Sequence, residues 1–221
     1  MSRLLLVVIS LVLGFGSLGS AEARRPRNQP QPTSSEAGVF DYYVLSLSWS
    51  PTFCLTHPDN DQCSGKGYGF VLHGLWPQYA AGGWPEECPP VTALSAADNS
   101  KGLTLFPTSD LLSHEWRKHG TCSALGPQGY FDAADKALGV VKIPTIFEPS
   151  RSPHYLEASK IAEFFQQTNP SMPANGVAVQ CSGPELSEVH VCLTKALEFT
   201  SCGKDVKTLC RQGKIRVPGI R

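Results

Sequence analysis

The chain has 221 residues and carries 19 basic against 19 acidic side chains. This balance excludes the broad basic surface of a protein that binds nucleic acid tightly, but it allows an enzyme that binds a few nucleotides and releases them. The eight cysteines contain no Cys-x-x-Cys pair, which argues against a zinc ribbon and a thioredoxin-like redox centre.

The first residues predict a secretory signal peptide over residues 1–23. Arg3 precedes an apolar run over residues 4–13, and residues 21–23 read Ala-Glu-Ala, an A-x-A cleavage signature. This apolar run is too short to span a membrane, and no other apolar run approaches the length of a membrane span. We therefore expect no membrane contact after cleavage. All the cysteines follow the signal, and their even number predicts four disulfides in a secreted or periplasmic protein.

Residues 39–221 are expected to form one domain, because a chain of this size suits a single core. The lead-in over residues 24–38 is rich in Pro, Gln, Ser and Arg, which predicts disorder. Strands rich in β-branched and aromatic residues are predicted at 39–49 and at 67–76, where Pro77 ends the second. The stretches rich in Pro and Gly that follow these strands are predicted to be loops: 50–66 and 78–107.

A short helix is predicted from an N-cap at Thr108 or Ser109 to Gly120, which stands where a C′ glycine ends a helix. On that helix four polar residues border one side: His114, Glu115, Lys118 and His119. Two imidazoles, a carboxylate and an ammonium on one arc suit acid–base chemistry on an anionic substrate.

Other interpretations of these residues stay open. A polar arc also fits an ordinary solvated helix face. Zinc hydrolases place two histidines at i and i+4, whereas His114 and His119 are at i and i+5 with Lys118 in the i+4 position, which disfavours a zinc site. In the second predicted strand, His73 beside Gly74 also fits a core histidine that is bonded to a backbone carbonyl.

The remaining elements complete the predicted fold. Helical patterns cover residues 129–138 and 153–168, and further strands are predicted at 176–181, 187–199 and 214–218. Helices mixed with antiparallel-looking strands, without regular β-α alternation, indicate the α+β class. We therefore expect a central, mainly antiparallel sheet that is flanked by helices and stapled by disulfides.

Two segments carry a family resemblance. Residues 70–77 read Phe-Val-Leu-His-Gly-Leu-Trp-Pro, and residues 114–122 read His-Glu-Trp-Arg-Lys-His-Gly-Thr-Cys. Together they resemble the two active-site signatures of the ribonuclease T2 family of secreted endoribonucleases. Residues 43–54 also resemble that family's first core strand and loop, and the resemblance extends from about Phe40 to the C-terminal cysteine cluster.

The resemblance implies cleavage of single-stranded RNA but not of DNA, because the ribose 2′-OH is the nucleophile. His119 would act as general base and His73 as general acid. Glu115 and Lys118 would act at the phosphoryl group, where Lys118 would stabilise its charge, and His114 would bind the phosphate. The products would be 2′,3′-cyclic phosphates and then 3′-phosphates. We expect a monomer that needs no metal or other cofactor, since side chains handle the protons.

The resemblance also points to residues that bind the base. Trp76 matches a tryptophan that stacks on a base, although a core tryptophan at a strand end is the alternative. Tyr68 and Gln78 are further candidates for the same pocket. Gln78 stands where some relatives carry an acidic residue, so their base preference does not transfer and low specificity is expected. Leu111 and Leu112 replace an aromatic pair of many relatives, which leaves a second base subsite open.

The family's cysteine order implies the pairs Cys54–Cys63, Cys88–Cys122, Cys181–Cys210 and Cys192–Cys202. The rival hypothesis is a catalytically silent relative that acts as a secreted binding or signalling protein. Such a relative would carry a broken signature, and neither signature is broken here.

Overall fold

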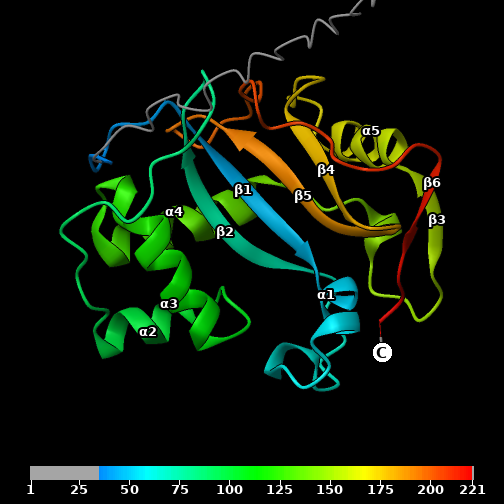
Figure 1. The fold of residues 1–221 in the computed structure, drawn as a ribbon, viewed down its shortest axis with the longest axis horizontal. Coiled ribbons are helices and arrows are strands. Elements are labelled where there is room, and N and C mark those ends of the chain that lie inside the picture. The colour runs from blue at the N-terminus through cyan, green and yellow to red at the C-terminus, as the bar shows by residue number, and fades with distance from the viewer. Residues whose placement is uncertain (1–34, 221) are drawn as a thin grey trace, which may run out of the picture. The chain divides into compact units, whose positions relative to one another are not determined.

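The computed structural model describes residues 35–220, so the predicted signal peptide and most of the predicted lead-in lie outside it. The described residues form one α+β domain around a six-stranded sheet, which confirms the predicted fold class (Figure 1). In this range no helix is both long and apolar enough to cross a membrane. Of the lead-in, residues 35–38 are described, and Gly38 N donates to Cys122 O at 2.8 Å.

Helices and strands succeed one another irregularly along the described chain. The helices are α1 (Ser50–Thr56), α2 (Ala96–Gly102), α3 (Ser109–Lys118), α4 (Gly126–Val140) and α5 (Ala158–Thr168). Short 3-10 turns are η1 (Asp61–Cys63), η2 (Gly120–Ser123) and η3 (Thr145–Phe147). The strands are β1 (Tyr42–Trp49), β2 (Phe70–Gln78), β3 (His154–Glu157), β4 (Val177–Ser182), β5 (Glu185–Leu193) and β6 (Lys214–Val217).

The sheet is mainly antiparallel, as predicted. Its strand order is β2-β1-β5-β6-β3, with β4 paired to β5, and among the strands of the described residues only the β5–β6 pair is parallel. One face of β1 and β5 is apolar and buried: Tyr43, Leu45, Leu47, Val189 and Val191. Helix α4 packs against β1 and β2, and its buried aromatic residues join the same core (Figure 1). The other face of these strands is therefore free to carry polar groups.

Several boundaries differ from the predictions. The predicted loop 50–66 contains α1, because Pro51 stands at the first turn of that helix, where its missing N–H is no loss. The predicted loop 78–107 contains α2, which starts with a capping box between Ser95 and Asp98. Gly120 begins the turn η2 instead of only ending α3.

Three further boundaries, all at strands of the sheet, differ from those that the local sequence pattern predicts. The predicted helix 153–168 is helical only from Ala158, because residues 154–157 pair with β6 as strand β3. Strand β2 continues past Pro77 to Gln78, which is tolerated since β2 lies at the edge of the sheet. The predicted strand 187–199 is shorter, because β5 ends at Leu193.

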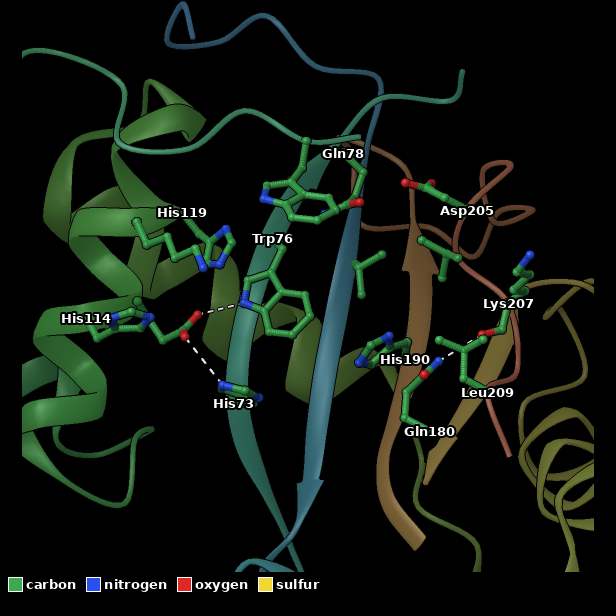
Figure 2. A pocket seen from close by; sticks show the side chains of 15 residues that line it. His73, Trp76, Gln78, His114, His119, Gln180, His190, Asp205, Lys207 and Leu209 are labelled. Carbon is green, nitrogen blue, oxygen red and sulfur yellow. Dashed lines mark hydrogen bonds and ion pairs between the residues drawn. The ribbon is translucent and has the colours of Figure 1, made fainter. Parts of the chain in front are cut away.

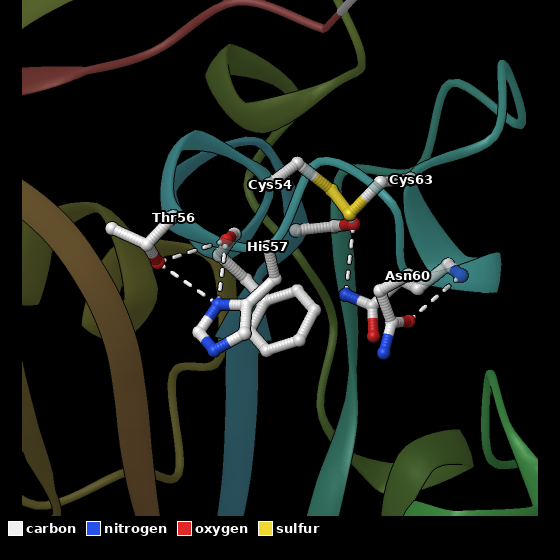
Figure 3. Close-up of a disulfide and its surroundings, with 8 residues drawn as sticks. Cys54, Thr56, His57, Asn60 and Cys63 are labelled. Atoms are coloured by element: carbon white, nitrogen blue, oxygen red, sulfur yellow. Dashed lines mark hydrogen bonds between the residues drawn. A yellow bond between two sulfur atoms is a disulfide. The ribbon is translucent and has the colours of Figure 1, made fainter.

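All four disulfide pairs expected from the family resemblance are present: Cys54–Cys63, Cys88–Cys122, Cys181–Cys210 and Cys192–Cys202. The first joins α1 to η1, whose N-cap Asn60 accepts from the backbone N–H of Gln62 at 3.0 Å (Figure 3). The second joins the long loop after β2 to η2, directly behind the end of α3.

Candidate active site

Helix α3 forms as predicted and directs Glu115 and the C-cap His119 inward. Its N-cap Thr108 accepts from Leu111 N at 3.3 Å, and Leu112 and Trp116 are buried in the core. Packing of this apolar side fixes the rotation of the helix. Glu115 is 1% exposed and His119, the C-cap, is 6% exposed. Two of the four residues of the polar arc are therefore buried, whereas His114 is exposed and Lys118 is partly buried.

A β-bulge in β2 points the side chain of His73 toward the inward-facing polar residues of α3. Ser46 pairs with Gly74 and Leu47 with Leu72, so His73 has no partner across the β1–β2 ladder. In a regular strand, side chains three positions apart point to opposite faces. The extra residue changes this parity, and the rings of His73 and Trp76 lie 5.1 Å apart on one side of the sheet.

One cavity of about 340 Å³ collects seven of the eight predicted site residues: His73, Trp76, Gln78, His114, Glu115, Lys118 and His119. Figure 2 shows the labelled rings of His73, His114 and His119 grouped around Trp76. The eighth, Tyr68, lies elsewhere, at a small hollow that is lined by the Cys54–Cys63 disulfide. The strand β2 and the helix α3, far apart in the sequence, thus build one site.

His73 contacts carboxylates from two different elements. Its Nδ1 lies 2.6 Å from Oε1 of Glu188 on β5, and its Nε2 lies 3.6 Å from Oε1 of Glu115 on α3. Burial lowers the pKa of His73, but the Glu188 hydrogen bond and the two carboxylate charges exceed this effect and raise that pKa above 6.5. These side-chain partners distinguish His73 from a core histidine that is bonded to a backbone carbonyl.

Glu115 is a buried carboxyl group with an unusual proton affinity. Burial raises the pKa of Glu115 to about 7, against the opposing effects of His73 and of a hydrogen bond from Trp76. That bond runs from Trp76 Nε1 to Glu115 Oε2 over 2.6 Å. Gly74 leaves room for it, because a Cβ atom there would collide with both bonded atoms.

His119 has the opposite environment to His73. Its Nδ1 is buried without a hydrogen-bond partner in the described part of the chain. Burial, followed by the charges of Lys118, His73 and His114, lowers the pKa of His119 to about 3. The Trp76 ring lies 5.2 Å from the His119 ring, tilted by 31°. His119 is thus held as a neutral imidazole in the substrate-free cavity.

Two cationic or potentially cationic groups complete the α3 side. Lys118 Nζ has its nearest carboxylate at 3.9 Å, on the half-exposed Glu86, so its charge is only weakly paired. His114 is exposed at the cavity rim, and burial together with Lys118 and Arg117 lowers its pKa. An anion that enters the cavity meets both side chains.

The opposite wall contains residues that the sequence analysis missed. On β5, Glu188 binds His73 and His190 lines the cavity. Trp84, in a predicted loop, also lines it and is 46% exposed. The polar residues of β5 alternate with Val189 and Val191, a period-2 pattern that indicates one polar face. No comparable local signal marks Trp84, because one aromatic residue in a loop has no periodicity.

Within residues 35–220, no three or more His, Cys, Asp or Glu side chains are grouped so that they could hold a metal ion. The expectation that the reaction needs none stays a prediction for experiment.

Most of the site lies inside a region that matches known proteins. Residues 40–202 match the model of the Ribonuclease T2 family. A ribonuclease of Aeromonas hydrophila is 38% identical over 189 residues, which cover 78% of this chain and 80% of that protein. Ribonuclease DdI of Dictyostelium discoideum is 29% identical over 205 residues, which cover 84% and 87%.

Solved structures show the same fold. An RNase-related protein from Calystegia sepium superposes with a TM-score of 0.65 at 26% identity, covering 81% of this chain and 97% of its own. RNase NT in complex with 5′-AMP superposes with a TM-score of 0.61 at 25% identity, covering 81% and 98%. The sequence match and the fold agree, and the chain belongs to the ribonuclease T2 family.

Proposed function

We propose that this chain is an endoribonuclease that cleaves single-stranded RNA by attack of a ribose 2′-OH on the adjacent phosphate. The observation that carries the proposal is geometric: His73 from β2 and His119 from the end of α3 line one cavity, with their rings 5.1 and 5.2 Å from the Trp76 ring. Their surroundings also displace the two pKa values in opposite directions. Two titratable groups that their surroundings push apart are the expected arrangement for an acid and a base that work together.

In the first step, His119 takes the 2′-OH proton while the O2′–P bond forms. His73 gives its proton to the 5′ oxygen as the P–O5′ bond breaks, which leaves a 2′,3′-cyclic phosphate. Water then opens the cyclic ester to a 3′-phosphate with the two roles reversed. Each proton transfer is worth about 10²–10⁴-fold in rate.

Charge develops on the non-bridging phosphoryl oxygens during attack. Lys118 lines the same cavity as both imidazoles and would stabilise that charge, and His114 at the rim would hold the entering phosphate. Glu115, with its pKa of about 7, is also poised to share a proton with the phosphoryl oxygens. The side chains on α3 would thus act on the phosphate group, whichever base the nucleotide carries.

Base binding would use aromatic surfaces. Trp76 and the half-exposed Trp84 line the cavity, and stacking on one base is worth about 1–3 kcal/mol with little choice among bases. Gln78 lines the same space with its amide. The bound 5′-AMP of RNase NT supports a nucleotide site in this fold. Tyr68 lies outside this cavity, so its predicted role would require a second contact surface.

We also propose that the protein is a secreted or periplasmic monomer. Four disulfides among the described residues fit an oxidising compartment. The predicted signal peptide, which lies outside residues 35–220, gives the same destination. Sizing by light scattering and amino-terminal sequencing of exported protein test these two statements.

The activity is tested with matched oligonucleotides of one sequence in excess chelator. RNA should be cut to 2′,3′-cyclic and then 3′-phosphate ends, while DNA and fully 2′-O-methylated RNA should stay intact. His73→Ala and His119→Ala should each lower turnover by about 10²–10⁴-fold with unchanged circular dichroism. Cleavage of the methylated strand, or loss of RNA cleavage with chelator, would refute the mechanism. An inactive wild-type chain would instead favour the silent-relative hypothesis.

A further inference from the structure

Glu188 stands at the centre of a hydrogen-bond cluster on the polar face of the sheet. Its Oε1 lies 2.6 Å from His73 Nδ1 and accepts from Ser48 Oγ at 3.3 Å. Its Oε2 lies 2.7 Å from His190 Nε2 and accepts from Ser46 Oγ at 3.0 Å. Each carboxylate oxygen therefore has two partners, one hydroxyl and one imidazole.

Strand register produces this cluster. On the β1–β5 ladder, Ser46 is opposite His190 and Ser48 is opposite Glu188, and all four side chains share one face. The bulge in β2 then brings His73 over the same face from the other side of β1. The carboxylate is held by both serines independently of His73. Its position is therefore defined before any substrate enters.

An ionised carboxylate only accepts hydrogen bonds. Burial raises the pKa of Glu188, but the hydrogen bonds and charges of His190 and His73 together exceed this effect and lower that pKa well below its ordinary value, so Glu188 is ionised. Nδ1 of His73 must then carry a proton in both charge states of the ring. Nε2 is left to face Glu115 and the cavity, and it is the atom that gains or loses the exchangeable proton.

We propose that Glu188 is the positioning residue of His73: by accepting the Nδ1–H bond it fixes the tautomer and the orientation of the ring, so that Nε2–H points at the departing 5′ oxygen. This inference rests on the proposed function, in which His73 is the general acid. A carboxylate behind a reactive histidine orients the ring and stabilises its cationic form. The other titratable groups that face His73 come from α3 and its C-cap: Glu115, Lys118, His114 and His119.

The test compares two substrates in the full mature chain. Glu188→Gln removes the charge but keeps the size of the side chain. On a dinucleoside phosphate, whose alkoxide leaving group needs a proton, we expect kcat to fall about 10- to 100-fold with KM nearly unchanged. On uridine 3′-(4-nitrophenyl phosphate), whose leaving group departs without a proton, we expect a loss of less than about threefold. The alkaline limb of the dinucleotide pH profile should move to lower pH.

Glu185→Gln is the matched control. Glu185 lies on the same strand and pairs with Arg216 instead of with a cavity residue, so activity on both substrates should be unchanged. An equal loss on both substrates in Glu188→Gln, or no loss on either, would overturn the positioning role, because a structural defect does not distinguish leaving groups.

Nuclear magnetic resonance of ¹⁵N-labelled histidine gives a readout that needs no activity. In the wild-type chain, neutral His73 should be protonated at Nδ1, and its titration should move to lower pH in Glu188→Gln. A neutral His73 protonated at Nε2, or an unchanged titration, would overturn the inference. Failure of the proposed function has a different signature, since the wild-type chain would then cut neither substrate while the His73 spectrum still responded to Glu188.

Discussion

His73 and His119 carry the same side chain, and only their neighbours make them different. Glu188, 115 residues further along the chain, holds Nδ1 of His73. Nδ1 of His119 has no partner within residues 35–220. A buried imidazole without an acceptor loses the stabilisation of its charged form, whereas one beside a carboxylate gains it. The acid and base roles thus follow from long-range contacts that the two local signatures do not contain.

Glu115 lies in the candidate active site, and its burial makes the stability of the folded chain depend on pH. Its pKa is about 7 in the folded chain, above the ordinary 4.5. The folded state therefore holds a proton that the unfolded state releases between these values, and stability falls as the pH rises from about 4.5 through 7. Above that window a buried, charged Glu115 is less favourable than a neutral side chain of the same shape.

Glu115→Gln should therefore raise the melting temperature at pH 8, by about 2–8 °C, and change it little at pH 5. The amide oxygen still accepts from Trp76, while the charge beside His73 is lost, so RNA cleavage should fall by at least about 10-fold. Thermal melts at both pH values and a dinucleotide assay check this. Glu163→Gln, on the exposed side of α5, is the control and should change neither property. A melting temperature that drops at pH 8 would contradict the interpretation of Glu115.

The bulge in β2 is the local feature on which the cavity depends. It places His73 and Trp76 on one side of the sheet while Leu72 and Leu75 remain in the core. Gly74 lies at the bulge, against the Glu115–Trp76 hydrogen bond. A side chain at this position cannot be accommodated without moving one of these groups.

Gly74→Ala should therefore impair catalysis more than folding. We expect kcat/KM on RNA to fall by about 10²-fold or more, because displacement of a reactive group by about 1 Å costs that much. Gly139→Ala is the control, since its Cβ would meet open space on α4. That change should keep full activity and stabilise the helix by up to about 1 kcal/mol. Equal activity in the two variants would show that the bulge does not set the site.

Local signals predicted some of these elements well. The Thr108 cap and the apolar side of α3 depend on neighbours in sequence, and the helix is where they predict it. Helix α1 was missed because Pro51 was interpreted as part of a loop, although proline is also favoured in a first helical turn. Strand β3 and the bulge were not predictable, since both are defined by partners on other strands.

The complete cavity draws on segments from one end of the domain to the other. The two signature motifs contain His73, Trp76 and the polar residues of α3, and all of these lie within the matched region 40–202. The far wall includes Asp205, Lys207 and Leu209, which follow that region. No pattern in the sequence connects these residues to the motifs. The Cys181–Cys210 and Cys192–Cys202 disulfides tie their segment to β4 and β5.

The balance of charge over the chain predicts how RNA binding depends on salt. With 19 basic and 19 acidic residues, the chain has no net charge to attract a long polyanion. Two lysines, Lys118 and Lys207, line the cavity, and no arginine does so among the described residues. We therefore expect about two phosphates to be neutralised in the complex, which gives a slope of log K against log salt near −1.4 for a single strand.

Raising the salt from about 50 to about 200 mM should then weaken binding of a non-cleavable 2′-O-methyl oligonucleotide only about sevenfold. Fluorescence anisotropy over this range measures the slope. Lys118→Ala should make it shallower by about 0.7, whereas Lys136→Ala, on α4 outside the cavity, should leave it unchanged. A wild-type slope steeper than about −4 would require an extended basic track along the RNA. With such a track the chain would retain its substrate. With only a few contacts in the cavity, it binds the RNA, cuts it and releases the products.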